Sequence, residues 1–338
     1  MRARLAPLAV ALLALACASA PKPGPPVLAG SFFWEATAPG GGALYLLGSV
    51  HIGDGRKLEL DPRVEAAWQG SEALVVEVDT RALSPLDALE ITNRYGLYPQ
   101  DQNLQDSVSP ATYERLRGIL KQRGLSMQAA DRMRPWLLSQ WLAQQAYQAA
   151  GYDPENGVDA WFLRRVANEK RVGSPSGLPV VQLESADEQM ALFASLPDPL
   201  QEKMLVEMMD HDDQLISATR AILGAWERGD EQALDRLLFA TSGDADLEAF
   251  ERRVYSERNQ RMSERLALLA VDGRARFVVV GVGHLIGDES LPTLLALRGF
   301  SVQRVPGARV RAPGAAPSAR PAEPAPGPPP KPAEAPPP

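Results

Sequence analysis

Cysteine and histidine are both scarce in this chain of 338 residues, which contains one cysteine and three histidines. A single cysteine excludes an intramolecular disulfide framework and a metal site built from several thiolates. Because there are so few histidines, the sequence context of each one is informative.

A basic surface for nucleic acid is also missing. The formal net charge is −7, and no stripe of Lys and Arg runs along any segment. Neutralising phosphates requires such a stripe, so we expect no nucleic-acid partner. Hydrophobic residues make up 45% of the chain and charged residues 23%, which are ordinary values for a globular protein.

The apolar stretch near the N-terminus is too short to span a membrane. Leu5–Leu15 follows two arginines and leads into Cys17, an arrangement typical of a signal peptide. The residues before Cys17 resemble a bacterial lipobox, in which the cysteine is lipidated and becomes the mature N-terminus. The alternative is an ordinary cleaved signal with an incidental cysteine. We expect residues 1–16 to be the signal peptide and Cys17 to anchor the protein to a membrane of the bacterial cell envelope, facing the periplasm or the exterior.

Proline is concentrated towards the two ends of the chain. Residues 17–30 are rich in Pro, Ala and Gly and predict a tether. Residues 307–338 contain almost only Pro, Ala, Gly and a few charges, a composition that cannot bury a core and predicts disorder. The folded domain is therefore predicted to occupy residues 31–306.

Two stretches of this domain share one pattern. Leu44–Asp54 and Phe277–Asp288 each contain a short apolar run, then Gly-x-x-His, and soon afterwards Gly-Asp. The run predicts a buried strand that ends in a turn. The first glycine of each pattern, Gly48 or Gly281, permits a tight turn or a close approach of another group at the end of the strand.

The histidines of the two patterns, His51 and His284, would lie just past the carboxyl ends of their strands. In open α/β sheets ligands bind at that edge. One such histidine is more often a capped turn or a core residue, but two in matching contexts favour a shared site. The third histidine, His211, lacks this context and is expected to be a solvated helix residue.

Strands are predicted near both ends of the domain and helices between them. The expected strands are Ser31–Ala36, Leu44–Leu47, Ala73–Val78, Pro179–Leu183, Phe277–Val280 and Ser301–Val305, the first two forming a hairpin. Apolar residues at intervals of three and four predict helices elsewhere, including Pro199–Glu227 and Leu247–Val271. The predicted fold class is therefore α/β (α+β), with the two strand–GxxH units in one central sheet and a long helical insertion between them.

Glu77 is the unusual residue of the strand predicted at Ala73–Val78. A carboxylate within an apolar run is costly to bury unless it is paired or binds a metal. Glu77 falls near the same sheet edge as the two histidines, which favours a role in a shared site. The alternative is a solvent-facing position on an edge strand. Asp79 would share the face of Glu77 and is a weaker candidate.

The helix predicted at Leu247–Val271 has two polar residues within its apolar stripe. Arg258 and Asn259 occupy a turn at which the spacing from Val254 to Met262 predicts apolar side chains. Buried polar groups require specific hydrogen bonds, so Arg258 is expected to orient a carboxylate or to stabilise an oxyanion. A local bend that turns both residues to solvent is the alternative.

Two acidic residues are secondary candidates for the site. Glu184 follows the strand predicted at Pro179–Leu183, at the edge where the site is expected. A favourable interaction of its carboxylate with the N-terminal dipole of the next helix, beside Ser185, would equally explain a glutamate at this position. Asp159 lies in the first turn of a predicted helix, where capping alone can explain it.

Taken together, these segments resemble the TraB/GumN family, which includes the Tiki metalloproteases. The resemblance covers about Phe32–Val305, and its segments appear in the order of the family. They are Leu47-Gly-Ser-Val-His51, Leu74-Val-Val-Glu-Val78, Gly157-Val-Asp-Ala-Trp-Phe162, Glu184 with Glu188-Gln189, Arg258-Asn259 and Val280-Gly-Val-Gly-His-Leu285. In the Tiki branch two GxxH histidines and a strand glutamate are required for metal-dependent proteolysis. The resemblance implies that His51, His284 and Glu77 have these roles here.

The resemblance implies a metal-dependent peptidase or related hydrolase, in which a metal-activated water attacks a peptide or amide carbonyl. Two imidazoles and a carboxylate would leave a coordination position open, and a ligand set without thiolate suits Mn, Co or Zn. One alternative is a metal-free hydrolase with His51 as general base, as the distantly related erythromycin esterases suggest. Another is a non-catalytic ligand-binding or regulatory lipoprotein. The expected partner is a peptide or small-molecule substrate.

Overall fold

The computed structural model describes residues 27–29, 32–169, 177–239 and 245–305. The predicted signal peptide, Cys17 and the predicted C-terminal tail lie outside these residues. Within the expected tether only Val27–Ala29 is described, and this segment forms strand β1, which pairs in parallel with β4 (Leu58–Leu60). No helix within the described ranges is long and apolar enough to cross a membrane.

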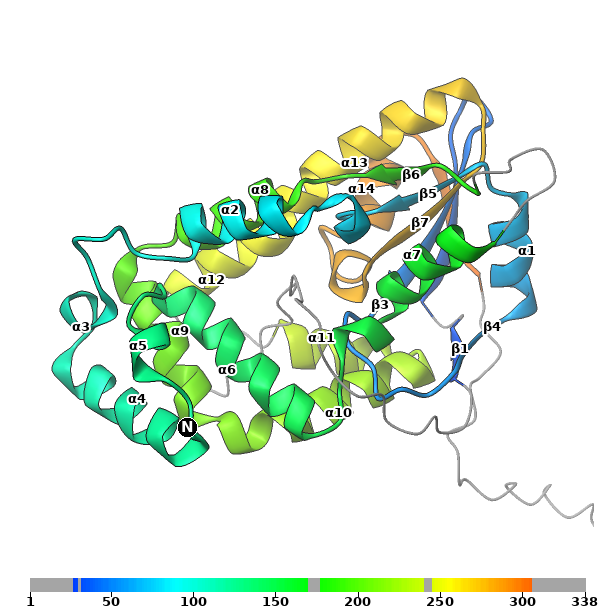
Figure 1. Ribbon diagram of the computed structural model, residues 1–338. Coiled ribbons are helices and arrows are strands. Elements are labelled where there is room, and N and C mark those ends of the chain that lie inside the picture. The colour runs from blue at the N-terminus through cyan, green and yellow to red at the C-terminus, as the bar shows by residue number, and fades with distance from the viewer. Residues whose placement is uncertain (1–26, 30–31, 170–176, 240–244, 306–338) are drawn as a thin grey trace, which may run out of the picture.

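A six-stranded mixed sheet forms the centre of the fold, with the strand order β6-β5-β7-β3-β2-β8 (Figure 1). Its strands are β2 (Phe33–Thr37), β3 (Ala43–Ser49), β5 (Ala73–Val76), β6 (Val180–Gln182), β7 (Arg276–Gly281) and β8 (Ser301–Arg304). Strands β6, β5, β7 and β3 are parallel, whereas β2 is antiparallel to both β3 and β8. The predicted α/β class, the single central sheet and the β2–β3 hairpin are confirmed.

The two strand–GxxH units are neighbours in this sheet. Strands β3 and β7 pair in parallel, with Gly48 opposite Val280 and Ser49 opposite Gly281. Both carboxyl ends therefore lie at one edge, from which the chain continues to a histidine in each unit. Strand β5 pairs with the other side of β7, so Glu77, which follows β5 directly, reaches the same edge.

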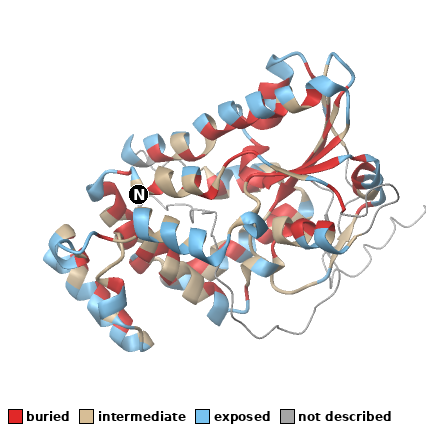
Figure 2. Ribbon diagram, turned by 45° about the horizontal axis from the view of Figure 1, so that its top comes forward, coloured by how far each residue is buried: buried red, intermediate tan, exposed pale blue. Residues whose placement is uncertain are grey.

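Helices cover both faces of the sheet. Helices α1 (Pro62–Gly70) and α7 (Val158–Asn168) cover one face, and α13 (Glu257–Leu269) and α14 (Leu291–Leu297) cover the other (Figure 1). The Trp68 ring on α1 packs edge-on against Phe277 of β7, with 5.4 Å between ring centroids. Strand β7 is buried along its whole length. Figure 2 shows the buried residues gathered along the strands and the inward faces of the helices.

Most of the remaining helices belong to the insertion between the two GxxH units. They are α2 (Pro85–Tyr95), α3 (Leu104–Ser107), α4 (Pro110–Arg123), α5 (Met127–Ala130), α6 (Pro135–Ala149), α8 (Ala186–Ala194), α9 (Asp198–Asp210), α10 (Asp212–Arg228), α11 (Glu231–Leu238) and α12 (Ala245–Glu251). The insertion has apolar clusters of its own, one of which includes Leu116, Leu138 and Leu205. Helices α3 and α5 have one turn each, too short for periodicity to predict.

Two of the predicted helices are interrupted. The helix predicted at Pro199–Glu227 is wrong as a single element, because α9 ends before His211 and α10 begins after it. The segment Asp210–Asp213 contains no apolar residue, so the periodicity on either side could not locate a break. In the helix predicted at Leu247–Val271, a π-helical turn, η3 (Arg252–Ser256), separates α12 from α13.

Candidate active site

His51, Glu77 and His284 converge at the carboxyl edge of the parallel strands. His51 Nε2 lies 4.0 Å from Glu77 Oε1, and His284 Nε2 lies 3.6 Å from Glu77 Oε2. The side chains of Glu77 and His284 are 8% and 4% exposed, whereas that of His51 is 25% exposed. The structure thus brings together three residues that are far apart in the sequence, and His51 is the most accessible of them.

The loop that carries His51 is fixed from two sides. The backbone N–H of Val158, at the start of α7, donates to the carbonyl oxygen of Val50 at 3.0 Å. On the other side, the indole Nε1 of Trp226 donates to the carbonyl oxygen of Gly48 at 2.9 Å. A Cβ atom at Gly48 would meet Phe32 Cβ and Val282 Cγ2 at 3.0 Å each, so this glycine permits close packing at the end of β3.

Asp159 contacts the nitrogen of His51 that faces away from Glu77. Its Oδ1 lies 3.3 Å from His51 Nδ1. Asp159 does not cap its helix, since the N-cap of α7 is Gly157 and no side chain caps it. Burial alone would lower the pKa of His51, but the carboxylates of Asp159 and then Glu77 outweigh it and raise this pKa to about 9.

Asn259 holds His284 in a single tautomer. The Asn259 amide donates through Nδ2 to the carbonyl oxygen of Glu289 at 2.9 Å, which leaves Oδ1 facing His284 Nδ1 at 2.6 Å. His284 Nδ1 is therefore the donor in that contact, and Nε2 carries the lone pair. Burial, which outweighs the opposing charge of Glu77, lowers the pKa of His284 to about 3.

Arg258 links Glu77 to Glu184. Its Nη2 donates to Glu77 Oε2 at 2.5 Å and to Glu184 Oε2 at 2.7 Å, and its Nε donates to Glu184 Oε2 at 2.9 Å. The backbone N–H of Gly281 donates to the other oxygen, Glu77 Oε1, at 2.6 Å. Burial would raise the pKa of Glu77, but His284, Arg258, His51 and this N–H together hold it well below its usual value.

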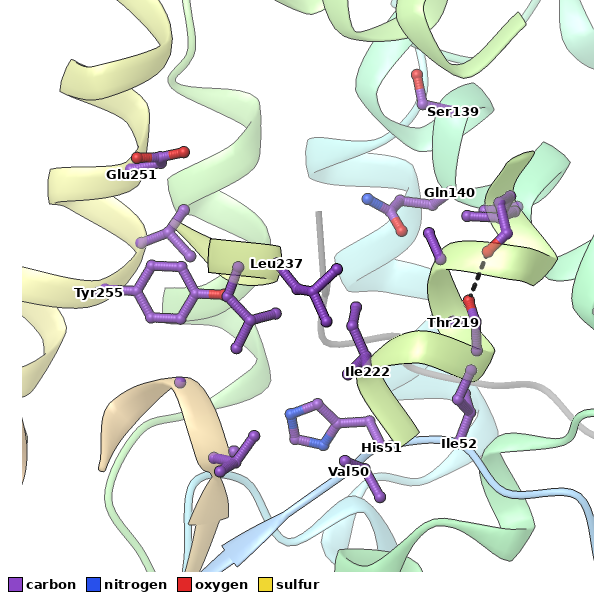
Figure 3. Close-up of a pocket in the computed structure, with 18 of the residues that line it drawn as sticks. Val50, His51, Ile52, Ser139, Gln140, Thr219, Ile222, Leu237, Glu251 and Tyr255 are labelled. Atoms are coloured by element: carbon purple, nitrogen blue, oxygen red, sulfur yellow. Dashed lines mark hydrogen bonds between the residues drawn. The ribbon is translucent and has the colours of Figure 1, made fainter. Parts of the chain in front are cut away.

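A cavity of about 670 Å³ opens from these residues into the helical insertion. Most of its wall is apolar, formed by α6 and by α8 to α12 together with the loop after β3. Figure 3 shows His51 at one side of this space, with Ile222, Leu237 and Tyr255 around it and Gln140 and Glu251 farther away. His211 also lines the cavity, from the break between α9 and α10, and its Nε2 lies 3.3 Å from Glu207. The side chain of His211 is 44% exposed, as expected of a solvated residue, but the expectation that it lies within a helix is wrong, because it separates α9 from α10.

Comparison with known sequences gives the family. The profile of the TraB/PrgY/gumN family matches residues 32–304. The chain belongs to this family. It is 25% identical to the uncharacterized protein YbaP of Escherichia coli (strain K12) over 272 residues, which are 78% of this chain and 93% of YbaP. An uncharacterized protein of Treponema pallidum (strain Nichols) is 21% identical over 277 residues, which are 79% of this chain and 80% of that protein. No solved structure matches the chain.

The predicted metal site of this family member can be tested against the donor atoms. Ligands of a tetrahedral zinc, each about 2.1 Å from the ion, lie roughly 3.4 Å from one another. The 3.6 Å separation of His284 Nε2 and Glu77 Oε2 is close to this value, and the 4.0 Å separation of His51 Nε2 and Glu77 Oε1 is wider. Consistently, no three His, Cys, Asp or Glu side chains in the described part of the chain form a closed metal cluster.

The space between the three side chains is nevertheless kept clear by Gly281. A Cβ atom on this glycine would lie 3.0 Å from His51 Nε2, 3.3 Å from Glu77 Oε1 and 3.6 Å from His284 Cδ2. Any side chain at this position would fill the space that the three residues surround. The donor types and this space fit a divalent metal, whereas the 4.0 Å separation of His51 Nε2 and Glu77 Oε1 is wider than a tetrahedral site requires.

Other residues at the site of this family member were undervalued or missed by sequence reasoning. Asp159 appeared to be a helix cap, because only the packing of α7 against the His51 loop reveals its contact. Gln189 was not considered, although its Nε2 lies 3.3 Å from Glu184 Oε2. Tyr255 follows Val254 of the apolar stripe and was not considered, yet it lines the cavity. Asp79 does not join the site, since its side chain caps the short helix η1 (Thr80–Ala82).

Proposed function

We propose that this protein is a metal-dependent hydrolase, with His51, Glu77 and His284 as the metal ligands and a peptide or other amide as substrate. One observation carries the proposal. His284 Nδ1 is hydrogen-bonded to Asn259 Oδ1, His51 Nδ1 lies 3.3 Å from Asp159 Oδ1, and each imidazole directs Nε2 towards the same carboxylate. An acceptor behind each histidine is the usual arrangement around metal-bound imidazoles, because it fixes the tautomer and strengthens the donor nitrogen.

The surrounding residues hold this arrangement in place. Asp159 orients His51, Asn259 orients His284, and Arg258 with Gly281 positions Glu77. Glu184 balances the charge of Arg258, so that the guanidinium is shared between two carboxylates. When bound, a divalent cation would polarise the scissile carbonyl and lower the pKa of a water molecule. Hydrolysis then adds water across the amide C–N bond and releases a carboxylate and an amine.

The cavity supports a substrate with apolar groups next to the scissile bond. Its wall beyond the polar cluster includes Ile52, Ile222 and Leu237. The hydroxyls of Thr219 and Ser139 in that region are hydrogen-bonded within their own helices, since Thr219 donates to the carbonyl of Leu215 at 2.8 Å and Ser139 to that of Pro135 at 2.8 Å. Burying apolar substrate surface there contributes roughly 25 cal/mol per Å² to binding.

A metal-free hydrolase is the second candidate, because the Asp159–His51 pair also has the form of a base with its orienting carboxylate. A general base must be neutral to accept a proton, and a pKa of about 9 keeps free His51 protonated at neutral pH. A cation that binds His51 Nε2 must also displace the proton from the imidazole, but the free energy of metal binding drives this proton release. This comparison favours the metal-dependent reaction.

The test combines metal content with hydrolysis of a peptide library by the full chain. We expect about one divalent ion per chain in the wild type, as for a single three-ligand site. His51→Ala and His284→Ala should lose the ion and the activity, while the control His211→Ala should retain the ion. Chelation should abolish hydrolysis, and adding back the metal should restore it. Activity that survives complete removal of metal would overturn the proposal in favour of the metal-free reaction.

A further inference from the structure

The two GxxH units differ at the residue before the histidine. The first unit, Gly48–His51, has a valine there, and the second, Gly281–His284, has Gly283. A Cβ atom at Gly283 would lie 2.6 Å from Cε1 and 3.3 Å from Cζ of the Tyr255 ring. Contacts below about 3 Å do not persist, so the glycine is what allows Tyr255 to lie against this unit.

Tyr255 is held at an irregular point of its helix. It belongs to the π-helical turn η3, and such turns occur frequently at functional sites. Its ring packs edge-on against Phe239 with 4.9 Å between centroids, and its centroid lies 5.4 Å from that of His284. These contacts on two sides, together with Gly283 on a third, fix the direction of the phenol.

The hydroxyl of Tyr255 faces the cavity that His51, Glu77 and His284 also line, and Figure 3 shows Tyr255 and His51 at different sides of this space. Among the described residues none is hydrogen-bonded to this hydroxyl. Tyr147, which lines the same cavity, differs in this respect because its hydroxyl is hydrogen-bonded to Thr219. Burial raises the pKa of Tyr255 to about 12, so the phenol keeps its proton at neutral pH.

The other donors at the site are already used. Arg258 donates to Glu77 and Glu184, and the Asn259 amide donates to the carbonyl of Glu289. Gln189 directs its amide towards Glu184. Besides Tyr255, the hydroxyl of Ser49 is buried at the cavity without a partner among the described residues. Of these two hydroxyls, that of Tyr255 belongs to a ring that packs against a histidine of the cluster, with 5.4 Å between the centroids of Tyr255 and His284.

We propose that Tyr255 is a further catalytic residue, which donates a hydrogen bond to the carbonyl oxygen of the substrate as that oxygen gains negative charge. This inference rests on the proposed hydrolase function and adds the group that stabilises the oxyanion. A neutral donor suits the position, because the charge of Arg258 is balanced by two carboxylates and its Nη1 donates to the carbonyl oxygen of Val254 at 3.2 Å. Removing one such donor from a hydrolase costs about 10²–10³ in kcat.

The experiment compares Tyr255→Phe with the matched control Tyr147→Phe in the full chain. Both variants keep the ring and remove one hydroxyl from the wall of the same cavity. One readout is kcat and KM for the best peptide of the library. The other readout is the affinity for an alkyl trifluoromethyl ketone, measured by fluorine NMR. The hydrate of this ketone has a tetrahedral carbon with two oxygens and so resembles the intermediate of amide hydrolysis. Tyr255→Phe should lower kcat by about 10²-fold or more with little change in KM, and should weaken ketone binding by a similar factor. Tyr147→Phe should lower kcat and ketone affinity far less, because its hydroxyl is already hydrogen-bonded to Thr219.

Three results would overturn the proposal. If the wild type hydrolyses peptides and binds the ketone but Tyr255→Phe is equally active, the phenol is not a donor, although the proposed hydrolase function stands. If Ser49→Ala, and not Tyr255→Phe, produces the loss, the donor is the serine. If the wild type neither hydrolyses peptides nor binds the ketone, the hydrolase function itself fails. Equal thermal melting temperatures of the variants and the wild type would show that the fold is retained.

Discussion

The two GxxH units have the same strand, the same sheet edge and the same motif, yet they hold their histidines differently. His51 is 25% exposed and contacts a carboxylate, which contributes to a pKa of about 9. His284 is 4% exposed and contacts an amide, and its pKa is about 3. The motif therefore determines where each histidine lies, while Asp159 of α7 raises the pKa of His51 and burial lowers the pKa of His284.

This difference suggests a division of roles within one site. His284, Asn259 and Glu77 form the buried and rigid side, in which the tautomer is set and the lone pair of Nε2 is available. His51 forms the accessible side, next to the cavity, and must lose a proton before Nε2 can bind a cation. We therefore expect substitutions around His284 to affect stability most and substitutions around His51 to affect the pH dependence most.

The largest effect is expected from Arg258→Leu. Arg258 positions Glu77, and Glu77 faces the histidines of both GxxH units. The change leaves Glu77 and Glu184 buried without their shared cation, which should destabilise the protein by about 3–5 kcal/mol. Chemical denaturation of the variant and the wild type measures this. Arg261→Leu is the control, since its side chain is 50% exposed and 3.7 Å from Glu184, and it should cost at most about 1 kcal/mol. Equal effects of the two changes would refute the assigned role of Arg258.

A second comparison uses the residue before each histidine. Gly283→Ala places a methyl group against the Tyr255 ring and should destabilise the fold by about 1–3 kcal/mol, the usual cost of overpacking. Val50→Ala, the corresponding position of the first unit, removes partly buried atoms and should cost less. Thermal or chemical denaturation measures the loss of stability in Gly283→Ala and in Val50→Ala. A neutral Gly283→Ala would show that the ring moves freely, and would weaken the inference about Tyr255.

The pH dependence of stability should separate the two histidines. The pKa of His51 is raised in the folded state from about 6.5 to about 9. The resulting stabilisation is complete below the unfolded pKa and is lost as the pH rises through the folded pKa. In metal-free protein we expect a loss on the order of 1–3 kcal/mol across this window. Asp159→Asn should remove most of this dependence, as denaturation at a series of pH values would show. An unchanged profile in Asp159→Asn would contradict the assignment.

The smallest effect is expected at Ser49, where the first unit has a hydroxyl and the second has Val282. The Ser49 hydroxyl is buried without a partner among the described residues, so Ser49→Ala should be neutral or stabilising by up to about 1 kcal/mol. Val282→Ala should instead cost about 1–2 kcal/mol, because it removes two buried methyl groups. Melting temperatures provide the measurement, and a destabilising Ser49→Ala would indicate a hydrogen bond that the described contacts lack.

Much of the sheet could be predicted because each strand is marked by a short, continuous stretch of the sequence. An apolar run closed by a glycine signals a buried strand ending in a turn, and two such units in parallel necessarily direct their next residues to one edge. Glu77 was recognisable for the same reason, since a carboxylate in an apolar run requires a partner. Arg258 and Asn259 were recognisable because they interrupt a periodic stripe, and the structure directs both into the polar cluster.

The partners of these residues depend on packing between distant segments and were not predictable. Asp159 reaches His51 only because the start of α7 is hydrogen-bonded to the loop after β3. Tyr255 lies in the π-helical turn η3 and lines the cavity, and the regular helical periodicity of the sequence does not predict such a turn. His211 lines the cavity because a helix ends at it, and a single-residue break leaves almost no trace in periodicity.

The central claim is that His51, Glu77 and His284 form one metal site. The most direct measurement is anomalous X-ray diffraction from crystals of the protein grown with zinc or manganese. The account predicts one strong anomalous peak about 2.0–2.2 Å from Nε2 of both histidines and from an oxygen of Glu77. A peak at full occupancy elsewhere, or two imidazoles that remain apart without any peak between them in metal-saturated crystals, would contradict it.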